Sequence, residues 1–205
     1  MKQEERRQQT TRALLEAARE LIVEKGCHAV TMNDIMERSG LSKGAIFHYV
    51  KSKDEIFAWV LQQQLEATND RFQQEVQSGN HTFEGPMQRI AEGLSELEEP
   101  QSVTNKALMY LLGREDQPLV AEVLAAFYER SLSLSKHWIV TGQEHGVIPV
   151  SVDAERTSEL FVLMALGVRV RSSLPVGQGE RRKGDFARFI TDMLQAGAKE
   201  GREGQ

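Results

Sequence analysis

The sequence predicts an all-α protein in which a small N-terminal three-helix domain is followed by a larger helical domain. Apolar residues recur at intervals of three and four along most of the 205 residues, the period of a helix with one buried face. Alternation of apolar and polar residues, which marks a half-buried strand, never continues beyond a few residues. Glycine and proline gather at a few breaks, so the chain divides into helices joined by short loops.

The composition favours a soluble, cytoplasmic protein that folds alone. Hydrophobic residues make up 40% of the chain, which is enough for a sizeable core. No apolar run reaches the length of a membrane span, and the N-terminus lacks the apolar stretch of a secretory signal. The single cysteine and five scattered histidines form no disulfide framework or zinc pattern, so no cofactor or metal is expected. We assign Cys27 to packing, with redox sensing as the alternative.

Charge is unevenly distributed along the chain. The net charge of -5 argues against a nucleic-acid partner, because a duplex attracts basic surfaces. Residues 1–52, however, hold nine Lys and Arg against seven Asp and Glu, whereas residues 53–205 hold 16 against 23. The basic excess therefore lies in the N-terminal part, where it is useful for binding phosphate groups.

A first helix is predicted over residues 8–25. Leu14, Ala18, Leu21 and Ile22 fall on one face of this helix and predict its buried side. Gly26 follows as a C-cap, because glycine enters the left-handed conformation without steric cost.

Two short helices follow, and each has its own capping residue. Thr31, with Asp34 three residues later, begins the second helix in the manner of a capping box, and Gly40 ends it. Ser42 caps the third helix. Two short helices joined by a glycine-containing turn are the helix-turn-helix geometry, in which the second of the pair enters the major groove of DNA.

The outward face of the third helix carries Lys43, Gly44, Phe47 and His48. A glycine inside a helix costs about 1 kcal/mol relative to alanine. Gly44 therefore indicates that something approaches the backbone closely, and a DNA duplex is such a partner.

A fourth helix begins with the capping box Ser52-Lys53-Asp54-Glu55 and is predicted to end near Gln77. Later breaks divide the remainder into five predicted helices, over residues 86–98, 103–113, 117–143, 153–173 and 181–199. We therefore predict a helix-turn-helix DNA-binding domain over residues 1–52 and a helical ligand-binding and dimerisation domain over residues 53–205.

The segment from Ser42 to Phe57, SKGAIFHYVKSKDEIF, resembles the signature of the tetracycline-repressor (TetR) family of transcription regulators. The similarity covers about residues 8 to 60 and includes Gly26 and Thr31. Phe47 stands where the family more often has tyrosine. The resemblance implies that one set of residues faces the major groove, namely Ser42, Lys43, Gly44, Phe47 and His48. It implies that a second set holds phosphates, namely Thr31, Tyr49 and Lys53.

Several of these residues also have a purely structural interpretation. Thr31 and Ser52 cap helices whether or not they contact DNA, although a capped N-terminus is able to bind phosphate as well. In the alternative, Lys43 and Lys53 are solvated charges, but their positions at helix starts favour phosphate or base contacts. Tyr49 has core packing as its alternative, with the hydroxyl at the rim.

Residues 153–173 begin polar and become apolar on nearly all sides between Leu160 and Val168. A helix without a polar face must be covered on both sides, by its own domain and by a second subunit. The family resemblance implies that the last two long helices pair with their symmetry mates, and a two-fold dimer places two recognition helices in successive grooves. The predicted dimer interface consists of Leu160, Met164, Gly167, Val168, Phe186, Phe189, Ile190 and Met193.

Wide aromatic and methionine side chains on several predicted helices suit an adaptable apolar pocket. The predicted pocket residues are Trp59, Met87, Leu94, Met109, Tyr110, Phe127, Trp138 and Met164. For any one of them, ordinary core packing is the alternative.

Together these features predict a ligand-responsive, DNA-binding transcription regulator. By analogy with the family it is a repressor that binds a near-palindromic operator as a homodimer and that a small, mostly apolar inducer releases. One alternative is a helical regulator controlled by a protein or peptide. The other is an enzyme, which is disfavoured because the sequence has no glycine-rich phosphate loop, nucleophile elbow or paired metal-binding histidines.

Overall fold

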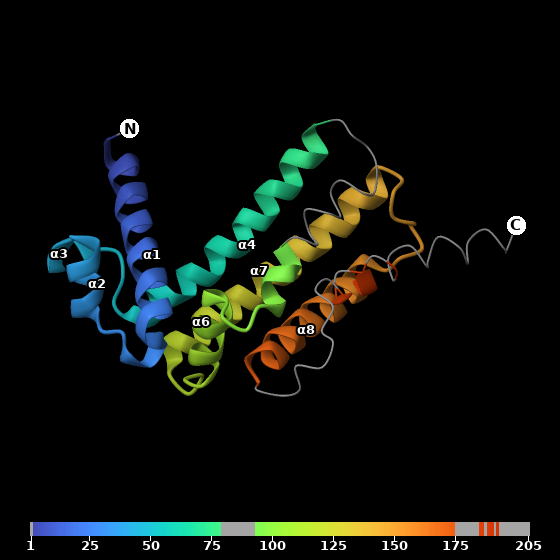
Figure 1. Cartoon of the computed structure of the whole chain (residues 1–205). Coiled ribbons are helices and arrows are strands. Elements are labelled where there is room, and N and C mark those ends of the chain that lie inside the picture. The colour runs from blue at the N-terminus through green and yellow to red at the C-terminus, as the bar shows by residue number, and fades with distance from the viewer. Residues whose placement is uncertain (1, 79–92, 175–184, 187, 191, 193–205) are drawn as a thin grey trace, which may run out of the picture. The chain divides into compact units, whose positions relative to one another are not determined.

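The structure is a computed structural model that describes residues 2–78, 93–174, 185, 186, 188–190 and 192. In this part of the chain the regular structure is helical without strands (Figure 1), which confirms the all-α prediction. The elements are α1 (Lys2–Ala29), α2 (Met32–Ser39), α3 (Lys43–Phe47), α4 (Lys53–Gln77), the 3₁₀ helix η1 (Glu96–Glu98), α6 (Val103–Leu112), α7 (Pro118–Glu144) and α8 (Ala154–Ser173).

The chain divides into two compact units. The first unit contains Met1–Gln64 and Val103–Phe127, and the second contains Leu65–Ser102 and Tyr128–Gln205. The long helices α4 and α7 each contribute turns to both units. These units describe packing, whereas the predicted domains 1–52 and 53–205 describe a division of function, which stays a prediction.

Of the two helix ends predicted at glycine in the first unit, the one at Gly40 is confirmed, whereas Gly26 kinks its helix without ending it. Gly26 has φ 75° and ψ 159° and kinks α1, which then continues to Ala29. Such a backbone conformation is open almost only to glycine. Gly40 ends α2 in the left-handed conformation, with φ 67°. α1 also begins earlier than predicted, because its first turns are exposed and polar and therefore carry no apolar periodicity.

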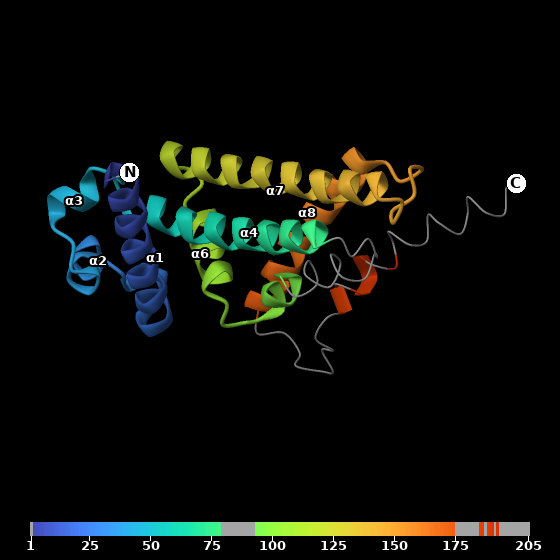
Figure 2. The ribbon, with the colours of Figure 1, turned by 90° about the horizontal axis from the view of Figure 1, so that it is seen from above.

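The core of the first unit lies where α1 packs against α2 and α6. Figures 1 and 2 both show α2 and α3 lying beside each other next to α1. The fully buried side chains of this core are large and aliphatic or aromatic, and include Leu14, Ile22, Ile35, Ile46, Ile56 and Phe57. Leu14 and Ile22 are on the face of α1 that the helical spacing predicts, and burial of Ile35 and Ile46 holds the short helices α2 and α3 in place.

The second unit is built on an aromatic core. Its buried cluster includes Phe72, Trp138, Phe161 and Phe186, which come from α4, α7, α8 and the segment after α8. The Gln143 side-chain amide donates to the carbonyls of Pro149 at 3.1 Å and Val152 at 2.8 Å, which fixes the loop between α7 and α8. Most of the predicted helices 86–98 and 181–199 lies outside the described residues.

None of the described helices is long and apolar enough to cross a membrane.

Candidate nucleic-acid interface

The first turn of α2 is fixed by a complete capping box, as the sequence predicts. The Thr31 hydroxyl accepts a hydrogen bond from the Asp34 amide at 3.2 Å, and Asp34 Oδ2 accepts one from the Thr31 amide at 2.7 Å. Lys25 Nζ lies 2.6 Å from the same carboxylate oxygen. The hydrogen bond from Lys25, followed by those from Thr31, holds the pKa of Asp34 well below its usual range.

A tight turn then leads into α3. After Gly40, the Ser42 side chain accepts a hydrogen bond from the Ala45 amide at 3.2 Å and caps α3, which confirms the predicted cap. Ile46 is completely buried and holds the short helix against the unit. The amides of Tyr49 and Val50 both bond to the Ile46 carbonyl, at 2.9 Å and 3.1 Å, so the chain turns directly after α3.

The side of α3 opposite Ile46 is open to solvent. Lys43, Gly44, Phe47 and His48 are all exposed, and 43% of the Phe47 surface remains accessible. A Cβ atom added at Gly44 would meet nothing within 4 Å, so the packing of this chain does not require glycine there. Lys43 Nζ lies 5.9 Å from the centre of the Phe47 ring. This face therefore offers a cation, a bare backbone and an aromatic ring to an external partner.

His48 and Tyr49 extend this face beyond the end of α3. Their rings meet edge to face, with centroids 4.9 Å apart. His48 is exposed and Tyr49 is half-buried, so Tyr49 belongs to the rim of the core. A tyrosine in this position is able to point its hydroxyl at a phosphate while its ring stays packed.

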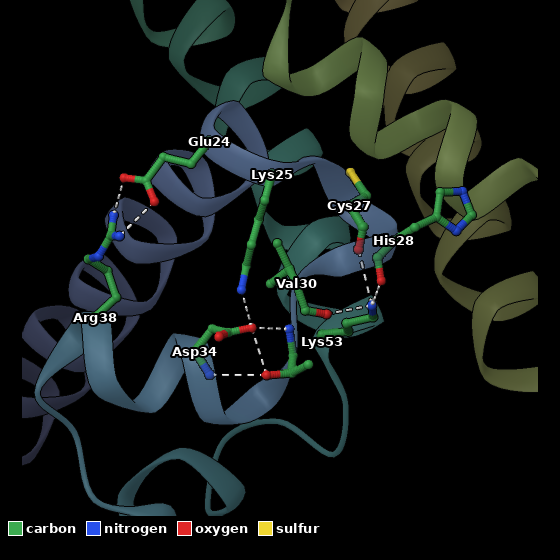
Figure 3. Close-up of polar contacts among 9 residues, drawn as sticks. Glu24, Lys25, Cys27, His28, Val30, Asp34, Arg38 and Lys53 are labelled. Atoms are coloured by element: carbon green, nitrogen blue, oxygen red, sulfur yellow. Dashed lines mark hydrogen bonds and ion pairs between the residues drawn. The ribbon is translucent and has the colours of Figure 1, made fainter.

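Ion pairs join α2 to α1 next to this face. Arg38 forms a fork-like pair with Glu24 at 2.8 Å and 2.7 Å, and also donates to Glu20 at 2.9 Å. Figure 3 shows the Arg38 guanidinium facing the Glu24 carboxylate. The hydrogen bonds from Arg38 lower the pKa of Glu24. Exposed pairs contribute little stability, but two parallel hydrogen bonds restrict the orientation of α2 on α1.

Lys53, the first residue of α4, points toward the end of α1. Its ammonium donates to the carbonyls of Cys27 at 3.0 Å, His28 at 3.3 Å and Val30 at 2.6 Å. Figure 3 shows the Lys53 nitrogen facing these carbonyls, with Lys53 and Asp34 on opposite sides of Val30. Burial, the largest influence, lowers the pKa of Lys53. The lysine therefore joins the beginning of α4 to the segment that leads into α2.

Asp54, the next residue, joins α4 to α6. The Tyr110 hydroxyl donates to Asp54 Oδ1 at 3.0 Å, and Arg114 Nη2 donates to Asp54 Oδ2 at 3.3 Å. The Tyr110 ring also meets Phe57 and His28 edge to face, at centroid distances of 5.4 Å and 4.9 Å. Burial, followed by the charge of Asp54, raises the pKa of Tyr110 to about 12. The sequence shows no sign of this cluster, because Asp54 lies 56 residues from Tyr110 and 60 from Arg114.

The cap of α4 differs in detail from the prediction. The Ser52 hydroxyl accepts from the Glu55 amide at 3.4 Å, as a capping box requires. The Glu55 carboxylate, however, accepts from the Lys51 amide at 2.9 Å. The glutamate thus reaches one residue further back and fixes the turn between α3 and α4.

The predicted DNA-contact residues fall into two settings. Those around α3 and the start of α2 are exposed or at the rim, namely Thr31, Ser42, Lys43, Gly44, Phe47, His48 and Tyr49. Lys53 faces backbone carbonyls instead. Contact with DNA stays a prediction for each of them.

The predicted pocket residues are divided between the two units. Trp59, Met109, Tyr110 and Phe127 belong to the first unit, and Leu94, Trp138 and Met164 belong to the second. Met87 lies outside the described residues. Leu94 and Trp138 are part of the second unit's buried core, and Met164 packs against it. These placements are those of ordinary core residues, and the pocket itself stays a prediction.

The predicted dimer residues also differ in exposure. Leu160, Gly167 and Phe189 are exposed, whereas Phe186 and Ile190 are buried in the second unit's core. Met164 and Val168 pack against that core, and Met193 lies outside the described residues.

An apolar stripe runs along α8. It is formed by Leu160, Leu163, Val170 and Leu174, of which 46%, 54%, 42% and 49% is exposed. Gly167 lies in the middle, and a Cβ atom there would meet nothing within 4 Å. The spacing of three and four residues places these positions on one helical face. The sequence analysis singled out only Leu160 and Gly167, although the same spacing pointed to the other three.

The described residues include no group of three or more His, Cys, Asp and Glu arranged to hold a metal ion.

Comparison with known proteins identifies the first part of the chain. The model of the family described as bacterial regulatory proteins, tetR family, matches residues 14–60. This segment contains most of α1, all of α2 and α3, and the first turns of α4. The match therefore covers the capped helix pair and its exposed face.

Individual relatives extend the similarity beyond this segment. The HTH-type transcriptional regulator UidR of Escherichia coli (strain K12) is 24% identical over 174 residues, which are 78% of this chain and 80% of UidR. The HTH-type transcriptional activator FasR of Mycolicibacterium smegmatis is 40% identical over 53 residues, 26% of this chain and 24% of FasR. These relatives regulate transcription and are not enzymes.

A solved structure has the same fold over most of the chain. It is Thermus thermophilus FadR, described as a TetR-family transcriptional repressor in complex with lauroyl-CoA. Its TM-score is 0.63 at 18% identity, and the similarity covers 91% of this chain and 94% of FadR. Residues 14–60 therefore carry the helix-turn-helix of the tetR family of bacterial regulatory proteins, and the chain as a whole has the fold of TetR-family transcriptional regulators.

Proposed function

We propose that the chain is a cytoplasmic repressor that binds a near-palindromic operator as a homodimer and that a small, mostly apolar inducer releases. The observation that carries this proposal is the exposed face of α3, where Lys43, Gly44 and Phe47 are presented to solvent. In this proposal Ser42, Lys43, Gly44, Phe47 and His48 enter the major groove. Thr31 and Tyr49 hold phosphates beside it.

Dimerisation is supported by the apolar stripe on α8. Side chains such as Leu163 and Val170 are half exposed on one face of a helix, and an apolar face of this kind marks an interaction site. Open space at Gly167 lets a second helix approach closely. A second copy is the proposed occupant, because a two-fold dimer brings the same face to itself and matches a palindromic operator.

An apolar inducer is supported by the relative described with lauroyl-CoA, which carries a long acyl chain. The wide aromatic and methionine residues of the chain suit such a ligand. The inducer releases DNA only if it binds better to a dimer whose α3 helices no longer match the grooves. Control by a protein or peptide is the second candidate function, and it is favoured by the same exposed stripe on α8.

DNA binding is tested by footprinting of wild-type protein on the DNA that flanks its own gene, at several salt concentrations and with small hydrophobic compounds added. We expect protection of two half-sites about one helical turn apart, lost on addition of an apolar inducer. Lys43→Ala should weaken binding and relax the specificity at the base that it contacts, with the oligomeric state unchanged. Protection of a single half-site would contradict the dimer. Unchanged affinity in Lys43→Ala would contradict the assignment of α3 to the DNA interface.

The dimer face is tested by Leu163→Glu, which places a charge in the middle of the apolar stripe. We expect a monomer in analytical ultracentrifugation, because an unpaired charge in an apolar interface is strongly unfavourable. Val150→Glu is the matched control, since Val150 is 87% exposed in the loop between α7 and α8. A variant Leu163→Glu that remains dimeric would contradict the proposed interface.

A further inference from the structure

We propose that Lys53 is a positioning residue for DNA binding, which fixes the segment leading into α2 and makes no contact with phosphate. The inference rests on the proposed function and deepens it, because it concerns how the reading helices are held. It also replaces the phosphate role that the family resemblance implies for Lys53. The observation is the convergence of three backbone carbonyls on one ammonium group (Figure 3).

The donors of Lys53 are fully used by this arrangement. An ammonium group has three N–H donors and no acceptor, and the carbonyls of Cys27, His28 and Val30 are three acceptors within 3.3 Å. A phosphate contact would therefore have to replace bonds that already exist. Lys43, in contrast, is exposed and has its charge available to DNA.

Two aromatic rings also lie close to the ammonium group. Lys53 Nζ lies 5.1 Å from the centre of the Tyr110 ring and 5.9 Å from that of Phe57. A cation placed over aromatic rings is stabilised by their electron-rich faces. Partial burial there also lowers the pKa of Lys53.

The three carbonyls lie where the chain leaves α1. Gly26 kinks the helix just before them, and the last carbonyls of a helix lack partners within it. A cation at this end also interacts favourably with the helix dipole. Val30 directly precedes Thr31, the cap of α2, and Lys25 holds Asp34 from the other side. The two lysines thus fix the start of α2 from both sides, and α2 supports α3.

The experiment measures affinity and its salt dependence in the full-length protein. The probe is a duplex selected by wild-type protein from a random-sequence pool. For Lys53→Met we expect affinity to fall about tenfold or more, the scale of one lost charge-assisted hydrogen bond. The slope of log affinity against log salt should equal that of wild-type protein, whereas the loss of a phosphate contact would reduce it by about one unit. A reduced slope in Lys53→Met would overturn the proposal.

Lys53→Arg distinguishes a positioning role from a phosphate contact, because a guanidinium and an ammonium group differ in shape. A guanidinium binds phosphate at least as well as an ammonium, but its planar fork does not match three carbonyls that converge on one point. We therefore expect Lys53→Arg to lose affinity as Lys53→Met does. Wild-type affinity in Lys53→Arg would support a phosphate contact and overturn the positioning role.

The matched control is Arg19→Gln. Arg19 also joins α1 to α4, through Gln63 at 3.2 Å and the Val60 carbonyl at 3.5 Å, and both of these partners lie on α4. We expect this variant to lower the melting temperature and leave affinity unchanged. If Lys53→Met likewise lowers only the melting temperature, Lys53 is merely structural and the proposal is overturned.

A readout without DNA separates this proposal from the proposed function. Hydrogen exchange of the Thr31 and Asp34 amides, which the capping box protects, should accelerate in Lys53→Met and stay unchanged in Lys43→Ala. If wild-type protein selects no duplex, the proposed function fails, and the exchange rates still decide the role of Lys53. Unchanged exchange in Lys53→Met would overturn it.

Discussion

Around Tyr110 in the first unit the helices meet through directed polar contacts, whereas around Trp138 in the second they meet through aromatic rings. Lys53 and Asp54, neighbours at the start of α4, bond to the end of α1 and to α6. In the second unit the Trp138 ring lies 5.9 Å from that of Phe72 and 6.5 Å from that of Phe161. Its indole N–H also donates to Asn69 at 3.1 Å.

This difference suits the roles that we propose for the DNA-reading helices and for the ligand-responsive part of the chain. A hydrogen bond is strong only within a narrow range of distances and angles, so the polar contacts fix how α1, α4 and α6 are oriented. Apolar contacts are not directional, and a core built from them tolerates some repacking. A surface that reads DNA needs a fixed orientation, and a domain that responds to a ligand needs adaptable packing.

The largest effect is expected from breaking the aromatic core with Phe161→Ala. The Phe161 ring is buried, contacts Trp138 and stacks on Phe186 at a centroid distance of 6.2 Å. Its removal leaves a cavity and should lower the free energy of unfolding by about 3–5 kcal/mol, measured by urea denaturation. Phe47→Ala is the control, because Phe47 is exposed on α3 and should change stability by less than about 0.5 kcal/mol. Equal losses in the two variants would contradict the assignment of the core.

A smaller effect is expected from Tyr110→Phe, which breaks the polar contact between α6 and α4. The variant removes a hydrogen bond to the buried Asp54 carboxylate but keeps the ring. We expect a loss of about 1.5–3 kcal/mol in the free energy of unfolding, the usual value for hydrogen bonds to charged groups. Tyr49→Phe, at the rim of the first unit, should keep wild-type stability and lose DNA affinity. If Tyr49→Phe instead lost stability and Tyr110→Phe lost only DNA affinity, the roles assigned to the two tyrosines would be wrong.

The contact between Tyr110 and Asp54 also leads us to expect a loss of stability at high pH. The pKa of Tyr110 is raised from 10.0 to about 12, so the folded state keeps a proton that the unfolded state releases. The stability advantage of wild-type protein over Tyr110→Phe should be complete below pH 10 and disappear as the pH rises to about 12. Unfolding free energies of both proteins measured across this range provide the test. A constant difference would show that the hydroxyl does not titrate in contact with Asp54.

The smallest effect concerns the surface of the first unit, at Asp34. Its pKa lies below the usual 3.8, so the carboxylate stabilises the folded state above that pH and the stabilisation is lost as the pH falls further. Wild-type protein should therefore be more stable than Asp34→Asn at neutral pH, and the two should converge in acid. Glu37→Gln, an exposed residue of the same helix, should follow wild-type protein throughout. A difference that persists in acid would assign the effect to side-chain shape instead of charge.

The caps and the turn of the candidate site were predicted correctly, because the interactions that form them are local. The caps at Thr31 and Ser42 and the turn at Gly40 each depend on residues within three or four positions. They were therefore visible in the order of the residues. Lys53 looked from the sequence like a phosphate ligand, because its carbonyl partners lie 23 to 26 residues away.

In the second unit, the sequence did not predict which side of a helix faces the core. α8 was correctly placed, but a helix that is apolar on nearly all sides gives no signal for which side faces the core. The structure buries Phe161 and Val162 and leaves Leu163 exposed. The predicted interface therefore combined exposed residues such as Leu160 with core residues such as Ile190.

By itself the sequence determined the helices, most of their caps and the exposed face of α3, because helical period and capping act over a few neighbouring residues. Only the tertiary structure decided that Lys53 turns to the end of α1 and that Asp54 meets Tyr110. It also decided which side of α8 stays open. These choices depend on contacts between residues far apart in the chain, and the balance of burial and hydrogen bonding that selects them exists only once the helices have packed.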